Sequence, residues 1–570
     1  MLKRTWRTKP EHQYGGSQVI NVRSLFVVPV LVALFAVAGC GSSSSSSDSS
    51  TAASGNVPQG GTLHVGAVDN PDHLDPAFAY TAEGWEILEA TNNGLLGFKK
   101  VAGDAGTEVE ADLAKALPTV SSDGKTYTFT LRDGVKFGPP ASRAIKASDV
   151  KATIERLFSA DSPGVGFYTG IVGAEEFQKN PTSGGISGIV ADDAKGTVTF
   201  KLTKKDGTFN EYMSIPFSFI LPKGTPNKDI STEKKYRVAT GPYAISTYVP
   251  KESIKLTRNP DFKAWAPGQA KGNLDAIDIK IGVTPEQAVN EIANGQLDWY
   301  LQTVAPDRLT EIKARYPDQV KDYVRANITF FTLNTRKAPL TDVNVRKAIN
   351  YAVDRDALVK IFGGQGAASE NILPPTMGTA YAAHSFYPYD LPKAKQLVDA
   401  SGTKGQSVEV WASNTDPQPK AAQYMAGVLD SLGYKATVKT LDEGIYYDTV
   451  GNEKTDPQIS YNDWNQDFAE GSNFIDPLLN GDRITNEGNN NGANIDVPAL
   501  NSKINAALEM PLGPARNKQW AEVDATMMKD YAPWVPFLNR RYPKFYGKNV
   551  KGVEFHGTFF ELFPSVYLQK

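Results

Sequence analysis

The distribution of apolar residues beyond Gly60 predicts short strands that alternate with amphipathic helices. Apolar and polar residues alternate with a period of two along residues 126–131, a pattern that turns one face of a strand toward a core. The same alternation predicts three further strands, at residues 197–202, 253–258 and 277–281.

A helix is predicted downstream of the first strand, with Ser148 as its N-cap. Its apolar residues are spaced at i, i+4, i+7 and i+8, which places them on one stripe of the helix surface. These residues are Val150, Ile154, Leu157 and Phe158. We therefore expect a helix that packs against a core.

A second helix is predicted after residue 283, because residue types typical of helix ends bound it. Thr284 and Gln287 have the spacing of a capping box, and Pro285 stands at the first helical position. Gly295 can end the helix.

A second block of the chain begins near Asn327 and repeats the order of strand and helix. The predicted strand covers residues 328–333, and Asp354 is the expected cap of a later helix. Between them, one helical stripe is formed by Val345, Ala348, Ile349 and Ala352. Two mixed α/β blocks are therefore expected, with ligand chemistry at their junction.

The amino-terminal region has the layout of a secretion signal. The apolar run of residues 25–39 follows Arg23 and has 15 residues, fewer than the ~20 that a membrane-spanning helix needs. It ends in Val37-Ala38-Gly39-Cys40, which resembles the bacterial lipobox. We expect residues 1–39 to be a signal peptide, Cys40 to be lipidated and to anchor the protein in a membrane, and the Ser-rich residues 40–59 to be a tether.

Composition and charge narrow the functions further. The 570 residues are 41% hydrophobic, which is typical of a globular protein with two or more cores. The chain has 60 basic and 63 acidic residues, so its net charge does not favour binding to nucleic acid. Cys40 is the only cysteine, which excludes intramolecular disulfides and multi-cysteine metal sites.

The motifs of common enzyme classes are missing. Asp123-Gly124-Lys125-Thr126 superficially suggests a phosphate-binding loop, but Thr119 stands where the leading glycine is needed. No nucleophile elbow of the form Gly-x-Ser-x-Gly is found. No histidine pair has the i, i+4 spacing of a helical zinc site among His12, His64, His73, His384 and His556. We expect no enzymatic activity, no cofactor and no metal, and a secreted hydrolase is the rival interpretation.

Several short motifs, in order along the chain, resemble the large extracytoplasmic solute-binding proteins of ABC importers, family 5, which includes oligopeptide-, dipeptide- and nickel-binding members. They are Leu74-Asp75-Pro76, Asn93-Gly94-Leu95-Leu96, residues 131–137, Thr240-Gly241-Pro242-Tyr243, residues 258–262, Gly295-Gln296-Leu297-Asp298 and residues 345–354.

The resemblance implies a two-lobed periplasmic-binding-protein-like α/β fold with mixed sheets. Lobe 1 is expected at residues 60–326 with an extra subdomain at about 100–240, lobe 2 at 327–538, and a return to lobe 1 at 539–570. The hinge is expected to be crossed twice, near residues 326–333 and 536–541, and to enclose ligand when the lobes close. The implied partners are ABC permease and ATPase subunits, and a monomer is expected.

The candidate binding site follows from one segment, Asp463-Trp464-Asn465-Gln466-Asp467-Phe468. It resembles the segment in which peptide-binding relatives place an aspartate, here Asp467, against the α-ammonium group of the ligand. Trp464 is the expected aromatic wall beside it. The alternative for Asp467 is a solvated loop residue, and the alternative for Trp464 is a core tryptophan. Weaker candidates, chosen by position in the second lobe, are Trp411, Asn414, Tyr446 and Tyr447.

Other ligands and roles remain open. Relatives often have a proline-containing continuation where this chain has Ala469-Glu470-Gly471, which leaves the ligand class in question. The resemblance implies capture of extracellular di- or oligopeptides for an ABC importer. A nickel chelate, an opine, a sugar, a heme-like molecule or a signalling peptide are alternative ligands, and a peptide-sensing receptor without transport is an alternative role. The lipobox and the tether favour the outer face of the membrane of a Gram-positive cell.

Overall fold

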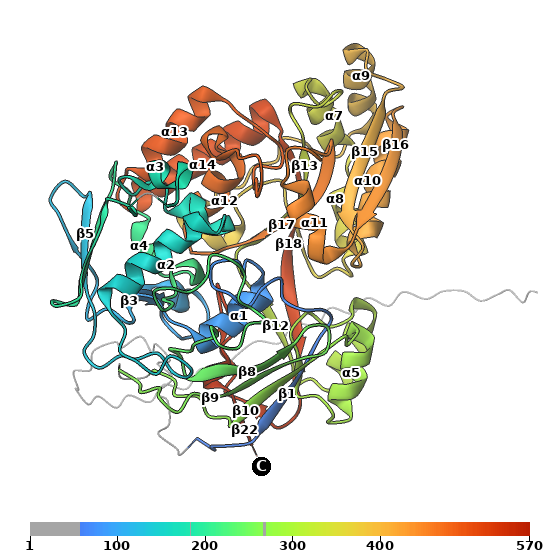
Figure 1. Ribbon diagram of the computed structural model, residues 1–570. Coiled ribbons are helices and arrows are strands. Elements are labelled where there is room, and N and C mark those ends of the chain that lie inside the picture. The colour runs from blue at the N-terminus through green and yellow to red at the C-terminus, as the bar shows by residue number, and fades with distance from the viewer. Residues whose placement is uncertain (1–56, 183, 266–268, 570) are drawn as a thin grey trace, which may run out of the picture. The chain divides into compact units, whose positions relative to one another are not determined.

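The computed structural model describes residues 57–569, except residues 183 and 266–268 (Figure 1). The predicted signal peptide, Cys40 and most of the predicted tether lie outside the described residues. Within the described part, no helix has the length and apolar character needed to span a membrane.

The first lobe contains a five-stranded mixed sheet with the order β11-β1-β10-β9-β8 (Figure 1). β1 runs parallel to β10 and β11, whereas β9 is antiparallel to both of its neighbours. The strands are β1 (Thr62–Ala67), β8 (Tyr243–Val249), β9 (Ser253–Arg258), β10 (Ala276–Ile281) and β11 (Trp299–Tyr300). Inward-facing Leu256 and Ile279 pack with Ile87 of α1 (Ala82–Thr91), which confirms the predicted alternation.

The helix predicted after residue 283 is α5 (Pro285–Ala293), and it is followed by α6 (Leu309–Arg315). The Thr284 hydroxyl accepts a hydrogen bond from the backbone N–H of Gln287 at 3.2 Å, as the capping pattern predicts. Gly295 follows the helix with a φ of 74°, a left-handed conformation that favours glycine.

A smaller unit within residues 96–212 carries its own four-stranded sheet, in the order β4-β5-β7-β6. Its strands are β4 (Thr119–Val120), β5 (Thr126–Thr130), β6 (Ile189–Asp192) and β7 (Thr197–Lys201), and its other elements are β2 (Leu96–Phe98), β3 (Val109–Ala111), α2 (Ala147–Ser159), α3 (Ala174–Lys179) and α4 (Phe209–Tyr212). The predicted apolar stripe of α2 is buried in the same core as Phe129 and Val198.

The prediction that Ser148 caps α2 is wrong. The N-cap is Lys146, whose backbone N–H donates to the Asp149 carboxylate at 2.9 Å. The helix starts earlier because Asp149, at the third helical position, accepts this otherwise unpaired donor. The Ser148 hydroxyl instead donates to Asp193 at 2.8 Å.

The second lobe is built on a sheet with the order β12-β18-β13-β17-β15-β16, to which β14 adds at β18. The end strand β12 precedes the passage into the second lobe, and its Val320 packs with α5 of the first lobe. Its strands are β12 (Val320–Val324), β13 (Asn327–Leu333), β14 (Gly366–Ala368), β15 (Ser407–Ser413), β16 (Lys435–Leu441), β17 (Ile459–Asn465) and β18 (Trp534–Phe545). Its helices are α7 (Val343–Ala352), α8 (Arg355–Ile361), α9 (Leu391–Ser401), α10 (Gln418–Ser431), α11 (Glu443–Val450), α12 (Ser472–Leu479), α13 (Pro498–Leu508) and α14 (Pro514–Thr526). Asp354 caps α8, as predicted.

The chain passes between the lobes twice, which confirms the predicted two-lobed architecture. The first passage precedes β13, and the second is β18, the long red strand of Figure 1. The amino-terminal half of β18 pairs with β13, and its carboxyl-terminal half pairs with β12. Beyond β18, Tyr546, Phe563 and Val566 pack into the core of the first sheet. The predicted return of the carboxyl terminus thus has a physical basis, although the residue limits of the lobes stay a prediction.

The return segment itself forms two short antiparallel pairs. One joins β19 (Val550–Lys551) to β22 (Tyr567–Leu568), and the other joins β20 (Phe555–His556) to β21 (Phe560–Glu561).

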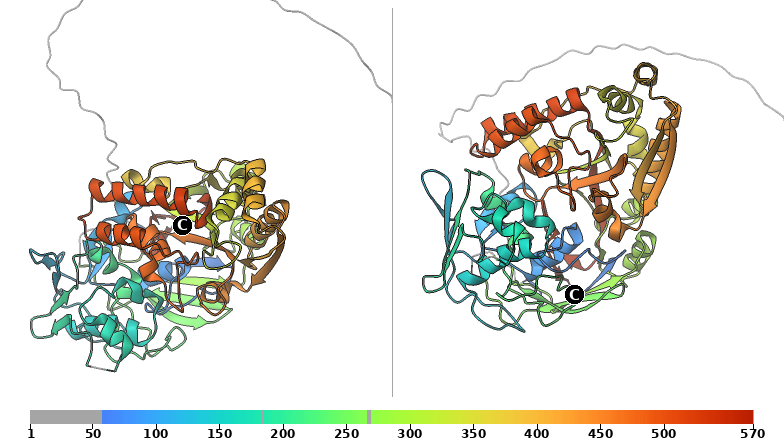
Figure 2. Two further views of the ribbon diagram at one scale, coloured as in Figure 1. Left: turned by 90° about the horizontal axis from the view of Figure 1, so that it is seen from above. Right: turned by 45° about the horizontal axis from the view of Figure 1, so that its top comes forward.

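The lobes also meet on the side opposite the hinge. Figures 1 and 2 show the extra unit, in teal, against the red helices α13 and α14. Arg516 of α14 is fully buried there, forms an ion pair with Glu470 at 3.0 Å and donates to the Thr208 hydroxyl at 3.2 Å. Phe468 enters the aromatic core of the first lobe, with its ring 5.6 Å from that of Tyr212.

The Leu74-Asp75-Pro76 motif owes its form to a buried ion pair between Asp75 and Arg156, at 2.8 Å for the longer of two bonds. Asp75 also accepts from the backbone N–H of Ala77 and of Ile230, so three segments converge on one carboxylate.

Asp75→Ala should lower the free energy of unfolding by about 3–5 kcal/mol, because Arg156 would remain buried without its counter-charge.

Chemical denaturation measures this loss. The exposed pair Lys404 and Asp399 supplies the control, since Lys404→Ala should cost less than about 1 kcal/mol. An Asp75→Ala variant no less stable than this control would contradict the structural role of the motif.

Candidate functional site

The candidate site lies where β17 ends. β17 is antiparallel to β13, and the backbone N–H of Gln466 makes the last bond of the ladder, to Ala326 at 3.0 Å. Because side chains alternate along a strand, Asp463 and Trp464 project to opposite faces of the sheet. The chain then leaves the sheet and places Asp467 toward the first lobe.

Asp467 is 6% exposed, and its two carboxylate oxygens have different surroundings. Oδ2 accepts hydrogen bonds from Asn473 Nδ2 at 2.8 Å and from the Tyr80 hydroxyl at 3.1 Å. Among the described residues, no group donates a hydrogen bond to Oδ1. One oxygen is therefore held by the protein, and the other is available to a ligand.

The electrostatic environment leaves this carboxylate short of positive charge. Burial raises the pKa of Asp467 to about 7, although the hydrogen bonds from Asn473 and Tyr80 and the charge of Arg325 act in the opposite direction. A ligand ammonium group at Oδ1 would supply the missing counter-charge.

Tyr80 brings the first lobe to the site. Its ring stacks on Trp85 at 5.6 Å between centroids and meets Trp464 edge-on at 5.9 Å. The Trp464 indole N–H donates to Asn473 Oδ1 at 3.2 Å. An aromatic wall built from both lobes thus adjoins the carboxylate, and the contact between Tyr80 and Asp467 depends on the lobes being close together.

Arg325 supports the segment from behind. Its guanidinium lies over the Phe560 ring at 4.2 Å and donates to the Gln466 carbonyl at 2.9 Å. Burial lowers the pKa of Arg325 to about 10. Its Nε and Nη1 atoms have no hydrogen-bond partner in the described part of the chain, so Arg325 acts on Asp467 through charge.

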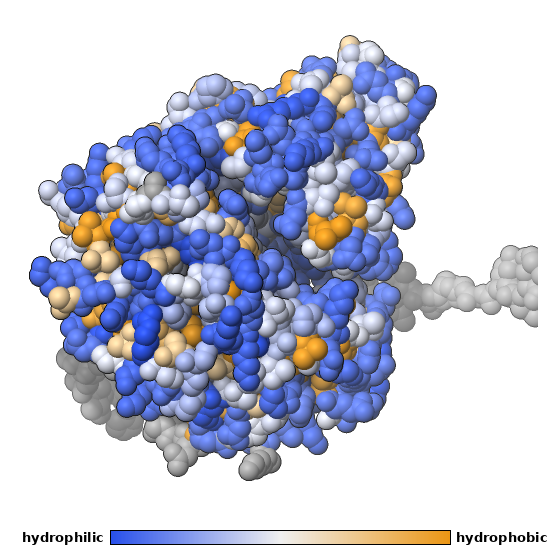
Figure 3. Space-filling model, viewed as in Figure 1, coloured by the Kyte–Doolittle hydropathy of each residue, from blue (hydrophilic) through white to orange (hydrophobic). Residues whose placement is uncertain are grey.

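The other face of β17 carries a second polar group of residues. Asp463 accepts from the Tyr447 hydroxyl at 3.0 Å and lies 3.5 Å from a guanidinium nitrogen of Arg540. Burial raises the pKa of Tyr447 well above its usual range, although 38% of the residue is exposed. These two properties together indicate a side chain in a recess, and Figure 3 shows a hollow in the region where Figure 1 places α11 and β17.

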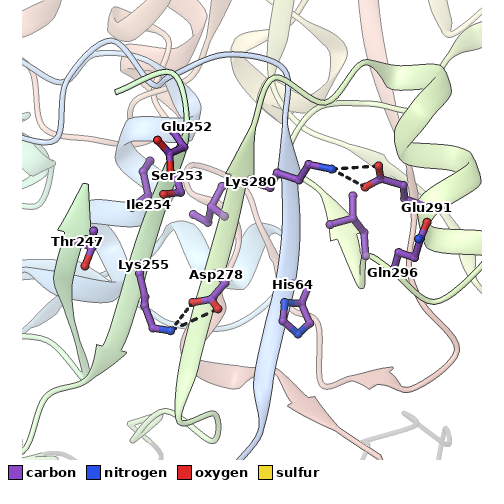
Figure 4. A pocket seen from close by; sticks show the side chains of 12 residues that line it. His64, Thr247, Glu252, Ser253, Ile254, Lys255, Asp278, Lys280, Glu291 and Gln296 are labelled. Carbon is purple, nitrogen blue, oxygen red and sulfur yellow. Dashed lines mark hydrogen bonds and ion pairs between the residues drawn. The ribbon is translucent and has the colours of Figure 1, made fainter. Parts of the chain in front are cut away.

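A separate groove lies on the outer face of the first sheet (Figure 4). Four of its five charged side chains are paired within the protein: Lys255 with Asp278 and Lys280 with Glu291, each at 3.1 Å. His64 lies between these pairs in Figure 4. Glu252, the remaining charge, is exposed to solvent, so the groove holds no buried charge that a ligand would have to balance, and the functional site is assigned elsewhere.

The structure brings some of the sequence-predicted residues together and separates others. Trp464 and Asp467 share Asn473, and Tyr447 lies beside Asp463. Tyr446 is fully buried, and its hydroxyl donates to the carbonyls of Trp411 and Tyr461, so it packs within the second lobe.

Within the described residues, the hydrogen bonds and ring contacts of Trp411 and Asn414 do not include Asp467. The indole of Trp411 is covered by the Lys439 ammonium at 3.6 Å and donates to Glu409. Asn414 is exposed just beyond β15. The sequence did not predict Tyr80, Arg325 and Asn473 as site residues. They lie outside the motif of residues 463–468, and no periodic pattern or motif marks them.

Residues 108–486 match the family model of bacterial extracellular solute-binding proteins, family 5. The chain is 27% identical over 481 residues to heme-binding protein A of Haemophilus influenzae, covering 80% of this chain and 82% of the relative. It is 26% identical over 512 residues to the probable D,D-dipeptide-binding periplasmic protein DdpA of Escherichia coli, covering 88% and 93%.

Among solved structures, clavulanic acid biosynthesis oligopeptide binding protein 2 superposes with a TM-score of 0.80 at 23% identity, over 90% of this chain and 96% of that one.

The burial of Asp467 should make the stability of the ligand-free protein depend on pH. Because its pKa rises from 3.8 to about 7 on folding, the associated stabilisation is complete below pH 3.8 and is lost as the pH rises through about 7. Asp467→Asn cannot ionise and keeps the shape of the side chain. It should raise the free energy of unfolding of the ligand-free protein at pH 8 by about 1–3 kcal/mol and change it little at pH 4.

Denaturation at both pH values tests this, with Asp399→Asn as the control because Asp399 is exposed. A less stable Asp467→Asn variant at pH 8 would show that the carboxylate is already compensated within the protein.

Proposed function

Because the chain belongs to the bacterial extracellular solute-binding proteins of family 5, we propose that it is the receptor of an ABC importer and captures peptides with a free amino terminus. The lobes close over the peptide, and Asp467 binds its ammonium group. Trp464 and Tyr80 form the wall beside that group, and Tyr447 borders a recess on the other face of β17.

The observation that carries this proposal is the unequal use of the Asp467 oxygens. Oδ2 already accepts two hydrogen bonds, whereas Oδ1 accepts none from the described residues. A buried carboxylate without a cation is costly, and an ammonium group both donates hydrogen bonds and carries the required charge. Of the two relatives compared above, DdpA is named for binding a peptide ligand.

A heme or nickel-chelate ligand fits the described residues less well. His556 is fully buried and lies near the Gly106 carbonyl, while His384 faces Asp524 at 3.1 Å. His73 lies 3.2 Å from Asp229, and His64 lies in the groove on the first sheet. No described histidine hydrogen-bonds to Asp467 or Trp464, and no described cluster of three or more His, Cys, Asp or Glu residues could hold a metal ion.

The cellular setting completes the proposal. Cys40 carries the lipid that holds the protein at the outer face of the membrane of a Gram-positive cell, and the Ser-rich tether separates the lobes from that membrane. The monomeric receptor delivers its peptide to the permease, which the ATPase subunits drive.

Isothermal titration of residues 57–570, which form one compact unit, tests the function. The protein is first unfolded and refolded to remove bound ligand, then titrated with dialanine, trialanine and pentaalanine and with their N-acetylated forms. At least one free peptide should bind, and its acetylated form should bind about tenfold to a hundredfold more weakly, the value of one charge-assisted hydrogen bond.

Hemin, a nickel chelate and maltose serve as comparison ligands. Binding of one of these with no response to any peptide would overturn the assigned ligand class, and equal binding of free and acetylated peptides would overturn the role of Asp467.

A further inference from the structure

Asn473 connects the two central residues of the proposed site. It is the second residue of α12 and is fully buried. Its Oδ1 accepts from the backbone N–H of Asp467 at 3.0 Å and from the indole N–H of Trp464 at 3.2 Å. Its Nδ2 donates to Asp467 Oδ2 at 2.8 Å.

These three bonds require a primary amide. The side chain must accept from two N–H donors at one end and donate to a carboxylate at the other, and an asparagine does both within one short group. The reverse orientation would set its NH2 group against two N–H donors, so the network defines the orientation.

Asn473 is itself held in place. Its backbone N–H donates to the Glu470 carbonyl at 3.0 Å, and the Glu470 carboxylate accepts from the N–H of Ser472 at 2.7 Å. Glu470 is in turn fixed by Arg516 and by the Trp520 indole. The amide therefore projects from the rigid first turn of a helix and not from a loop.

We infer that Asn473 is a positioning residue that orients the Asp467 carboxylate and the Trp464 indole as one unit and leaves Oδ1 of Asp467 free for the ligand. Asn473 need not touch the ligand, since all its assigned bonds are within the protein. The inference rests on the proposed function, because it concerns how that ligand is recognised.

Replacing a purely structural asparagine would change stability alone, so the test measures the affinity for free and N-acetylated peptides. Asn473→Ala is titrated with the alanine peptide that binds the parent best and with its N-acetylated form. The parent's preference for the free amine should fall to below about threefold, because Asp467 is no longer held facing the ligand. The pH at which affinity is half lost on acidification should rise, because a hydrogen bond that lowers the pKa of Asp467 has been removed.

Asn480→Ala is the matched control. Asn480 directly follows the same helix, is also fully buried, and makes three side-chain hydrogen bonds, to Asp476, Asn505 and Asp482. It should lose stability but keep both the preference for the free amine and the pH midpoint of the parent. If Asn473→Ala does not fold, Asn473→Ser is measured in the same way.

The outcomes separate the two proposals. A parent that does not distinguish free from acetylated peptide overturns the proposed function and, with it, this inference. A parent that does distinguish them, together with an Asn473 variant that retains the preference and the midpoint, overturns the role of Asn473 alone.

Discussion

The site depends on one carboxylate that is buried between two lobes without a full counter-charge. Asp467 is 6% exposed, and burial raises its pKa to about 7 even though Asn473, Tyr80 and Arg325 all favour its ionised form. A ligand-free closed protein must therefore keep a proton on Asp467 or bear the cost of a poorly compensated charge. In the proposed function, an ammonium group at Oδ1 removes this cost, which would link capture of the ligand to closure of the lobes.

The surrounding architecture keeps that carboxylate in place while the lobes remain separable. Asp467 directly follows the sheet of the second lobe, and Tyr80 directly precedes α1 of the first, so their 3.1 Å contact forms only when the lobes approach. On the side away from the hinge, Phe468 and the Arg516–Glu470 pair reach elements of the first lobe within a few residues of Asp467. The proposed recognition of the ligand and the contact between the lobes thus use the same short segment.

Local patterns predicted the elements well, because they depend on neighbouring residues: β5, the stripe of α2 and the cap of α5 lie where the periodicity placed them. The predicted N-cap of α2, Ser148, is wrong because the Asp149 carboxylate accepts the backbone N–H of Lys146 and the helix therefore begins earlier. Trp464 and Asp467 are only three residues apart in the sequence, so a single motif could locate both. Tyr80 lies 387 residues from Asp467, and only the tertiary fold brings them together.

The adjacent Tyr446 and Tyr447 show a finer limit. On one helix, successive side chains point about 100° apart, so one hydroxyl is used inside the lobe and the other reaches the recess. The apolar residues Ile445, Tyr446 and Tyr447 are consecutive and do not form a single stripe, so the sequence of the helix does not reveal which is which.

The most direct test of the central claim is the number of protons released when an amine-bearing peptide binds. Calorimetry at pH 6 in buffers of different ionisation enthalpy measures it. If the ligand ammonium replaces a proton on Asp467, binding should release close to one proton per peptide, and Asp467→Asn should release none. A binding enthalpy for the parent that is the same in every buffer would show that Asp467 is already ionised before the ligand arrives, and would contradict the account.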